Sequence, residues 1–210
     1  MASSKRNTSG PWRPFLFLLL AAGLVYLIVQ EAGGGGVMSS IVEEQTDPLS
    51  NNVRQYEEEV EKYAAEEGIA DQTDVLLALM MQESGGRGDD PMQASESYCG
   101  EVGCIEDPEV SIRQGVSYFA TTLEKADGDV KLALQAYNFG AGFIDYVMNR
   151  GGEYTQELAI SFSAEKYEEL KGTGEYSCIR EEAEQYDACY GDIYYVDAVL
   201  DYYEEEGGVS

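Results

Sequence analysis

Apolar residues recur at helical spacing from Asn51 onward. The first set advances in steps of three and four residues and stops before Gly68, as expected for one amphipathic helix: Val53, Tyr56, Val60 and Tyr63. The next run, residues 75–81, is apolar on nearly every side, which is typical of a helix buried at the centre of a fold. Thr73 is a candidate N-cap for this helix, and Glu83 follows its apolar part.

Side chains that favour helix N-termini mark the later helices. Four such positions are Asp107, Asp129, Thr155 and Asp192. Pro108 strengthens the first of them, because proline is preferred in the first turn of a helix. We expect the Thr155 helix to run to about Lys171, and another short helix to cover residues 143–148.

The remaining segments predict loops rather than strands. The stretch from Gly85 to Cys104 is rich in Gly, Ser, Asp and Pro, and residues 172–190 show no helical period. No segment alternates apolar and polar residues with period two. The predicted fold class is therefore all-α, with one domain of short helices over residues 50–210.

The N-terminal segment predicts export. Residues 1–14 are basic, and residues 15–30 form an apolar run somewhat shorter than the about 20 residues of a usual membrane span. The run is expected to be a signal-anchor or a signal peptide, and the lack of a small-x-small site before Gly33 favours the anchor. Residues 31–49 then predict a flexible linker. The membrane is thus an expected partner, and the domain is expected to be extracytoplasmic.

Charge and composition exclude several functions. The formal net charge is −27, and all 40 acidic residues follow Gln30. This excess argues against nucleic acid as a partner, because a phosphate backbone requires a basic face, and indicates a solvated acidic surface. The chain has no His, which excludes Ser-His-Asp and Cys-His catalysis and His-ligated zinc. Acid–base chemistry must come from Asp, Glu, Tyr, Lys or Cys.

The four cysteines form two close pairs along the chain, Cys99 with Cys104 and Cys178 with Cys189. Four cysteines allow three pairings, and in an exported protein the local one is the simplest expectation. A four-cysteine zinc site is the alternative, although the spacing differs from that of zinc ribbons.

Glu83 is the candidate catalytic acid. It ends an apolar helix and precedes a Gly-rich loop that carries further carboxylates and amides. Such burial raises a carboxyl pKa by desolvation, so the group would keep its proton near neutral pH. A helix-end carboxylate facing solvent is the alternative from position alone.

Three motifs resemble those of a known superfamily. Gln82-Glu83-Ser84, Pro91-Met92-Gln93 and Ala136-Tyr137-Asn138-Phe139-Gly140 occur in the order of the "ES", "GLMQ" and "AYNAG" motifs of goose-type lysozymes and soluble lytic transglycosylases. The match is closer to the bacterial lysozyme-like branch, which includes the N-terminal domain of CwlT-like wall hydrolases of conjugative transposons. It covers residues 50–205. Asp90-Pro91 replaces "GL", and Phe139 replaces a small residue.

The resemblance implies a lysozyme-like helical fold and cleavage of the β-1,4 bond between N-acetylmuramic acid and N-acetylglucosamine in peptidoglycan glycan strands. It implies that Glu83 is the catalytic acid and that the sugar cleft is lined by Ser84, Met92, Gln93, Tyr137 and Asn138. We also place Glu96 in the cleft, and expect neither a cofactor nor a metal. The peptidase domain of two-domain relatives has no counterpart in residues 1–210, so peptide cleavage is not implied.

The second catalytic group is open. An inverting hydrolase needs a carboxylate that activates water, and Asp89, Asp90 and Glu96 are candidates. Asp90 ranks first because Pro91 fixes the backbone after it, although Asp90 could equally brace the loop. A lytic transglycosylase needs no such base.

A non-catalytic wall-binding scaffold of a secretion apparatus is a third hypothesis. The resemblance further suggests wall opening in conjugative transfer or wall remodelling, with conjugation or secretion proteins as partners. It places the domain at the cell wall, anchored to the membrane or secreted.

Overall fold

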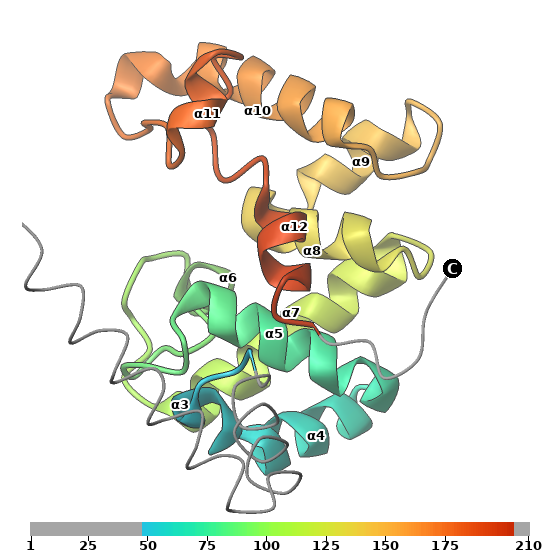
Figure 1. Ribbon diagram of the computed structural model, residues 1–210, viewed down its shortest axis with the longest axis vertical. Coiled ribbons are helices and arrows are strands. Elements are labelled where there is room, and N and C mark those ends of the chain that lie inside the picture. The colour runs from blue at the N-terminus through green and yellow to red at the C-terminus, as the bar shows by residue number, and fades with distance from the viewer. Residues whose placement is uncertain (1–47, 204–210) are drawn as a thin grey trace, which may run out of the picture. The chain divides into compact units, whose positions relative to one another are not determined.

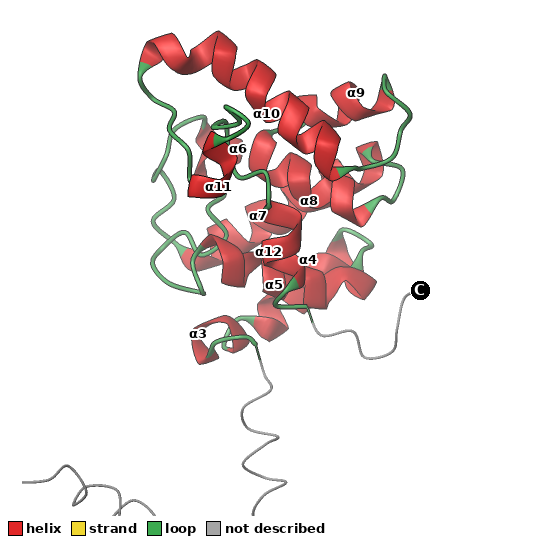
Figure 2. Ribbon diagram, turned by 45° about the horizontal axis from the view of Figure 1, so that its top comes forward, coloured by secondary structure: helices red, strands yellow, loops and turns green. Residues whose placement is uncertain are grey.

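The computed structural model describes residues 48–203. Within this range every regular element is a helix, which confirms the predicted all-α class (Figure 2). The elements are α3 (Asn51–Arg54), α4 (Glu57–Glu66), η1 (Ala70–Gln72), α5 (Thr73–Glu83), α6 (Ser95–Cys99), α7 (Pro108–Lys125), α8 (Val130–Phe139), α9 (Gly142–Met148), α10 (Gln156–Leu170), η2 (Lys171–Thr173), α11 (Glu181–Glu184) and α12 (Tyr195–Leu200).

The predicted basic and apolar N-terminal segments, and most of the predicted linker, lie outside the described residues. Among residues 48–203, no helix has both the length and the apolar character needed to cross a membrane.

Helix α5 is the centre of the fold. Residues 75–80 are all buried, as the apolar run predicted. Helices α3, α4 and α12 pack against it, and α12 also contacts α8, so that α12 lies between the two (Figure 1). Because α5 has no polar side, it is stable only when neighbours cover its whole circumference. Its last residue, Glu83, is partly buried.

The other helices build outward from α7 and α8. Helix α7 packs against both α4 and α8, and its buried stripe includes Ile112, Val116 and Phe119. Helices α9 and α10 join α8 through aromatic rings, with centroids 5.3 Å apart for Phe139 and Phe143 and 5.2 Å for Phe143 and Phe162. Such contacts bury large apolar areas and fix the α8–α9–α10 end of the fold.

Three predicted helix starts are confirmed by capping hydrogen bonds. Asp107 accepts from the amide of Glu109, Asp129 from that of Leu132, and Thr155 from that of Leu158. These bonds satisfy amide groups that have no partner inside the helix.

Two other predicted starts differ from the structure. Gln72 is the N-cap of α5, and the Thr73 hydroxyl instead donates to the Ala70 carbonyl at 2.8 Å. Helix α12 begins at Tyr195 rather than directly after Asp192. The Asp192 carboxylate instead accepts a hydrogen bond from the amide of Tyr194, in the turn that precedes the helix. In both places the chain makes a separate turn before the helix begins.

Three segments also differ from their predicted form. The single helix expected from Asn51 to Gly68 is two, α3 and α4, with a turn at residues 55–56. The loop ending at Cys104 contains α6, and residues 172–190 contain α11. Short helices of four or five residues span too few turns to leave a clear period in a sequence.

Both local disulfides are formed, Cys99–Cys104 and Cys178–Cys189. The predicted pairing is confirmed. Because each of the four sulfurs is bonded to one partner in a disulfide, no free thiolate is left for zinc, and the zinc alternative is wrong.

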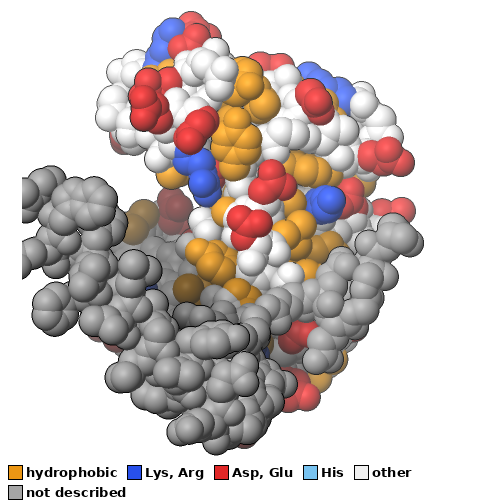
Figure 3. Space-filling view, in the orientation of Figure 1, with side chains coloured by type: hydrophobic (Ala, Val, Ile, Leu, Met, Phe, Trp, Pro, Cys, Tyr) orange, Lys and Arg blue, Asp and Glu red, His pale blue; other side chains and the backbone are white. Residues whose placement is uncertain are grey.

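Acidic side chains are dispersed over the visible face instead of gathering in one patch (Figure 3). The distribution agrees with the predicted solvated acidic surface.

The loop after α5 lies directly against α3. Gly86 has φ +73°, and a Cβ atom there would lie 2.4 Å from the Asn52 carbonyl oxygen and 2.7 Å from the Val53 nitrogen. The Ser50 hydroxyl donates to the Gly85 carbonyl at 3.0 Å. Only glycine fits where the two backbones come this close. The contact fixes the course of the loop that follows Glu83.

We predict that Gly86→Ala destabilises the protein more than Gly88→Ala. Gly88 has a similar φ of +78° but no atom within 4 Å of an added Cβ, so its substitution costs only the about 1–2 kcal/mol of left-handed backbone strain. Gly86→Ala must also displace α3, at an additional cost of about 1–3 kcal/mol. Urea denaturation measures both, and equal losses would contradict the close approach.

Candidate active site

A hollow of about 260 Å³ opens at the C-terminal end of α5. Its lining residues are Glu83, Asp90, Gln93, Ser95, Glu96, Val102, Gly103, Tyr137 and Asn138. A neighbouring hollow of about 290 Å³ shares Gln93, Glu96, Tyr137 and Asn138, and adds Tyr118 and Tyr190 among others. The two are adjacent parts of one cleft. A larger hollow of about 480 Å³, around Glu67 and Glu124, contains none of the predicted site residues.

Glu83 is a partly buried carboxyl at the cleft wall. Burial raises the pKa of Glu83 from 4.5 to about 7; the hydrogen bond from Tyr195 opposes this rise, and the nearby charge of Asp90 adds to it. A carboxyl with this pKa is substantially protonated at neutral pH. It can therefore donate a proton under conditions in which an ordinary glutamate cannot.

Tyr195 fixes the orientation of the Glu83 carboxyl from its buried side. Its hydroxyl donates to Glu83 Oε1, and the side chain is 2% exposed. Burial, followed by the charge of Glu83, raises the pKa of Tyr195 well above 10, so the phenol keeps the proton that it donates. Sequence reasoning missed this residue, because nothing in the sequence distinguishes it among 16 tyrosines.

The Asp90 carboxylate is held by four donors. Oδ1 accepts from the Ala94 amide at 2.9 Å and the Ser111 hydroxyl at 2.6 Å, and Oδ2 accepts from the Ser95 amide at 3.1 Å and hydroxyl at 2.6 Å. Burial opposes ionisation, but these bonds outweigh it and hold the pKa of Asp90 below its usual 3.8. Asp90 is thus an ionised group whose lone pairs are occupied.

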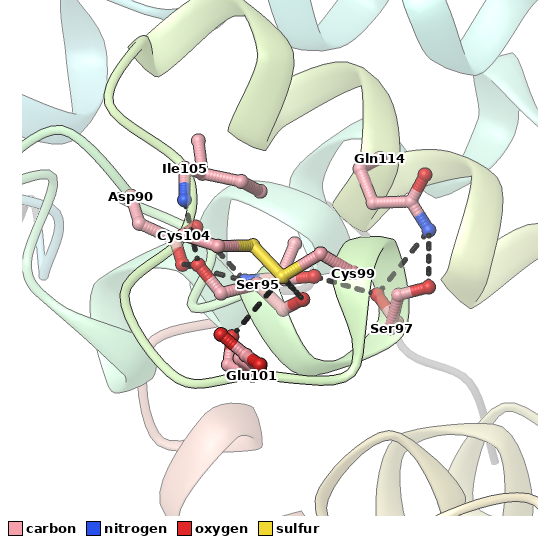
Figure 4. The surroundings of a disulfide bond; sticks show 9 residues. Asp90, Ser95, Ser97, Cys99, Glu101, Cys104, Ile105 and Gln114 are labelled. Carbon is pink, nitrogen blue, oxygen red and sulfur yellow. Dashed lines mark hydrogen bonds between the residues drawn. A yellow bond between two sulfur atoms is a disulfide. The ribbon is translucent and has the colours of Figure 1, made fainter.

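Ser95 links Asp90 to the disulfide loop (Figure 4). Its hydroxyl accepts from the Ile105 amide at 3.1 Å while donating to Asp90. Its carbonyl oxygen lies 3.3 Å from the Cys99 sulfur. Ser95 therefore holds the disulfide loop, which bounds the cleft, in a fixed position next to Asp90.

Ser84 and Met92 hold the loop after α5 in place next to the cleft. The Ser84 hydroxyl donates to the Pro91 carbonyl at 2.7 Å and accepts from the amides of Gly86 and Arg87. The Met92 side chain is fully buried, and its carbonyl accepts from the Tyr137 hydroxyl at 2.8 Å. The structure places neither side chain among those that line the two hollows.

Gln93, Tyr137 and Asn138 line both hollows, as does Glu96. Gln93 Nε2 donates to the Asp90 carbonyl at 2.8 Å, and Asn138 Oδ1 accepts from the Asp192 amide at 2.8 Å. Glu96 is exposed on α6, and no described residue donates to its carboxylate. Of these four residues, Glu96 is the one whose side chain makes no hydrogen bond within residues 48–203, so its whole carboxylate is available to water or a ligand.

Within residues 48–203, no three His, Cys, Asp or Glu side chains are grouped so that they could hold a metal ion. The groups in the cleft that can take part in a reaction or bind a ligand are carboxyl groups, tyrosines and amides.

A carboxyl whose pKa is raised by burial, with an ionised carboxylate nearby, is the arrangement known from lysozyme. A family model described as Lysozyme-like matches residues 50–203, and the chain belongs to this family. The resemblance inferred from the three motifs is thereby confirmed.

Individual relatives agree with this assignment. The chain is 50% identical over 119 residues to the bifunctional muramidase/DL-endopeptidase CwlT of Bacillus subtilis, covering 57% of this chain and 36% of CwlT. It is 36% identical over 148 residues to the uncharacterized membrane protein YocA of the same organism, covering 69% and 65%. The chain thus spans about a third of the first relative and just under two thirds of the second.

One solved structure is also similar. It is that of a Staphylococcus aureus Mu50 protein described as similar to lipoprotein, NLP/P60 family. The TM-score is 0.66 at 35% identity, and the match covers 77% of this chain and 55% of that one.

We predict that Glu83→Gln stabilises the protein in a pH-dependent way. Unfolded Glu83 ionises near 4.5, whereas the folded group stays protonated to about 7, so the wild type loses stability relative to the neutral variant between these values. The advantage of the variant should grow by roughly 3 kcal/mol and then stay constant above about pH 7. Urea denaturation from pH 4 to 8.5 measures this, and a constant difference would contradict the raised pKa.

Proposed function

We propose that this protein is a muramidase that cleaves the β-1,4 bond between N-acetylmuramic acid and N-acetylglucosamine in peptidoglycan, with Glu83 as general acid. The observation that carries the proposal is the protonated carboxyl of Glu83, with a pKa of about 7, at the wall of a cleft. The muramidase named among the relatives, at 50% identity, supports the same reaction.

The acid step follows from the state of Glu83. A glycosidic oxygen leaves readily only when it is protonated, and a general acid works best when its pKa lies near the working pH. The hydrogen bond from Tyr195 holds Oε1 on the buried side, so the carboxyl has a fixed orientation. Positive charge that develops on the sugar is then stabilised by nearby carboxylates.

The second carboxylate is better assigned to Glu96 than to Asp90. A base must accept a proton from water through a free lone pair, and four donors occupy those of Asp90. Glu96 lines the same hollow as Glu83 with its carboxylate free of described donors. We therefore assign water activation to Glu96, and to Asp90 a positioning role through the N-terminal end of α6.

The remaining predicted site residues divide into two groups. Gln93, Tyr137 and Asn138 line the cleft and offer amide groups and an aromatic ring to N-acetyl sugars. Ser84 and Met92 do not line the cleft, and they act by fixing the shape of the loop that runs between them.

The place of action follows from the same reasoning. Peptidoglycan lies outside the cytoplasmic membrane, where the predicted export segment would deliver the domain and where disulfides persist. Membrane anchoring through residues 15–30, and a role in conjugative transfer, stay predictions.

We predict that Glu83→Gln abolishes digestion of purified peptidoglycan, with a loss of about 100- to 10,000-fold in the rate of product release. The wild-type rate should fall above about pH 7 as the acid loses its proton. Mass spectrometry of the products checks the reaction type. Reducing-end sugars support the muramidase, whereas 1,6-anhydro products identify a lytic transglycosylase. No release by the wild type would refute both and leave a binding scaffold.

We predict that Glu96→Gln and Asp90→Asn change different properties of the protein, the first its activity and the second its stability. Glu96→Gln should lower kcat by about 100-fold or more without changing the melting temperature, because the side chain is exposed and contacts no described donor. Asp90→Asn should lower the melting temperature, because an amide nitrogen then faces hydrogen-bond donors. Glu106→Gln, at another exposed position, is the control. A fully active Glu96→Gln enzyme would exclude this base.

A further inference from the structure

Val102 is an exposed apolar side chain in the lining of the catalytic hollow. It is 80% exposed, the highest value among the large hydrophobic side chains of the described residues that face solvent. It lines the 260 Å³ hollow together with Glu83 and Glu96. A single exposed valine is ordinary on a protein surface. Its position beside the proposed acid makes it a candidate contact for whatever occupies the hollow.

The loop that carries Val102 is covalently closed. The disulfide joins Cys99, the last residue of α6, to Cys104 across five positions of sequence. Gly100 and Gly103, with φ of +82° and +75°, turn the chain at either side of Val102. A loop this short gains less global stability from a crosslink than a long one does, so the main physical result is a fixed loop shape.

The closed loop also contacts Ser95, one of the residues that line the hollow (Figure 4). The Cys99 and Cys104 sulfurs lie 3.3 and 3.6 Å from the Ser95 carbonyl oxygen. The Ile105 amide donates to the Ser95 hydroxyl, which donates in turn to Asp90. The position of Val102 is thereby tied through Ser95 to the residues around Glu83.

We propose that Val102 is a substrate-contacting residue, which packs against the apolar parts of the glycan strand and is held in place by the Cys99–Cys104 disulfide. This rests on the proposed function. N-acetyl sugars present acetyl methyl groups and C–H faces, which gain free energy when a branched apolar side chain covers them. Reduction of the disulfide frees the loop, so ordering Val102 then opposes binding.

Binding is separated from cleavage by using the full chain with Glu83→Gln. The ligand is peptidoglycan glycan strands freed of stem peptides, and isothermal titration calorimetry gives Kd. Adding Val102→Ser should raise Kd about 3- to 10-fold at an unchanged melting temperature. Ile179→Ser is the matched control, since Ile179 is 65% exposed beside the other disulfide and lines neither hollow of the cleft; Kd should stay constant.

The disulfide is tested by a double-mutant cycle. Cys99→Ser with Cys104→Ser should raise Kd to a similar extent, and Val102→Ser should then add little, because the loop no longer presents the side chain. Dithiothreitol should weaken binding of the Glu83→Gln parent but not of the Cys99→Ser/Cys104→Ser protein, which keeps Cys178–Cys189 as an internal control.

An unchanged Kd for Val102→Ser overturns the proposal, whether or not the cysteine variants fold. Fully additive effects overturn the coupling to the disulfide. If the Glu83→Gln parent binds no strand and the wild type releases no sugar, the proposed function fails, and this inference fails with it. Strand binding that is indifferent to Val102 leaves the proposed function standing.

Discussion

The hydrogen bond from Tyr195 to Glu83 joins two residues that are 112 positions apart. Helix α12 must lie across α5 for the two groups to meet, and α5 must be buried for the Glu83 carboxyl to stay protonated. Desolvation is the dominant effect on the acid, and the tyrosine moderates it while fixing its orientation. The packing of the central helices and the proton of the proposed acid are therefore one constraint.

The loop after α5 depends on a second, ionised carboxylate. Asp90 accepts hydrogen bonds from Ala94 and Ser95 at the N-terminal end of α6 and from Ser111 on α7, and its charge raises the pKa of Glu83 further. The pKa values of these two neighbouring carboxyls are therefore shifted in opposite directions, because desolvation dominates at Glu83 whereas four hydrogen bonds outweigh it at Asp90. This separation of pKa values is the usual way in which a protein obtains an acid and an ion in the same cleft.

Resemblance and geometry contribute differently to the functional argument. Lysozyme-like family membership gives the fold, whereas the proposal of a muramidase reaction rests on the state of Glu83 and on the carboxylates around it. Apolar and aromatic residues also line the cleft beside its polar groups, among them Val102, Tyr118 and Tyr190. Such surfaces are suited to sugar faces, which present C–H groups beside their hydroxyls.

The sequence alone determined the class of fold, the burial of α5 and the helix starts at Asp107, Asp129 and Thr155, and it favoured the pairing of the cysteines that the structure confirms. Each depends on residues that are close along the chain, where periodicity, capping and loop length act directly. It also singled out Glu83, because its motif stands at the end of an apolar run.

Only the tertiary structure decided which groups meet Glu83 and which carboxylate is free. One tyrosine resembles another in a sequence, so the role of Tyr195 depends on how α12 packs. Asp90 and Glu96 are likewise equivalent as letters, and they differ because Asp90 accepts hydrogen bonds from Ala94 and Ser95 and also from Ser111 on α7. The desolvation of Glu83 and the hydrogen bond from Ser111 to Asp90 both depend on long-range packing, which no local pattern encodes.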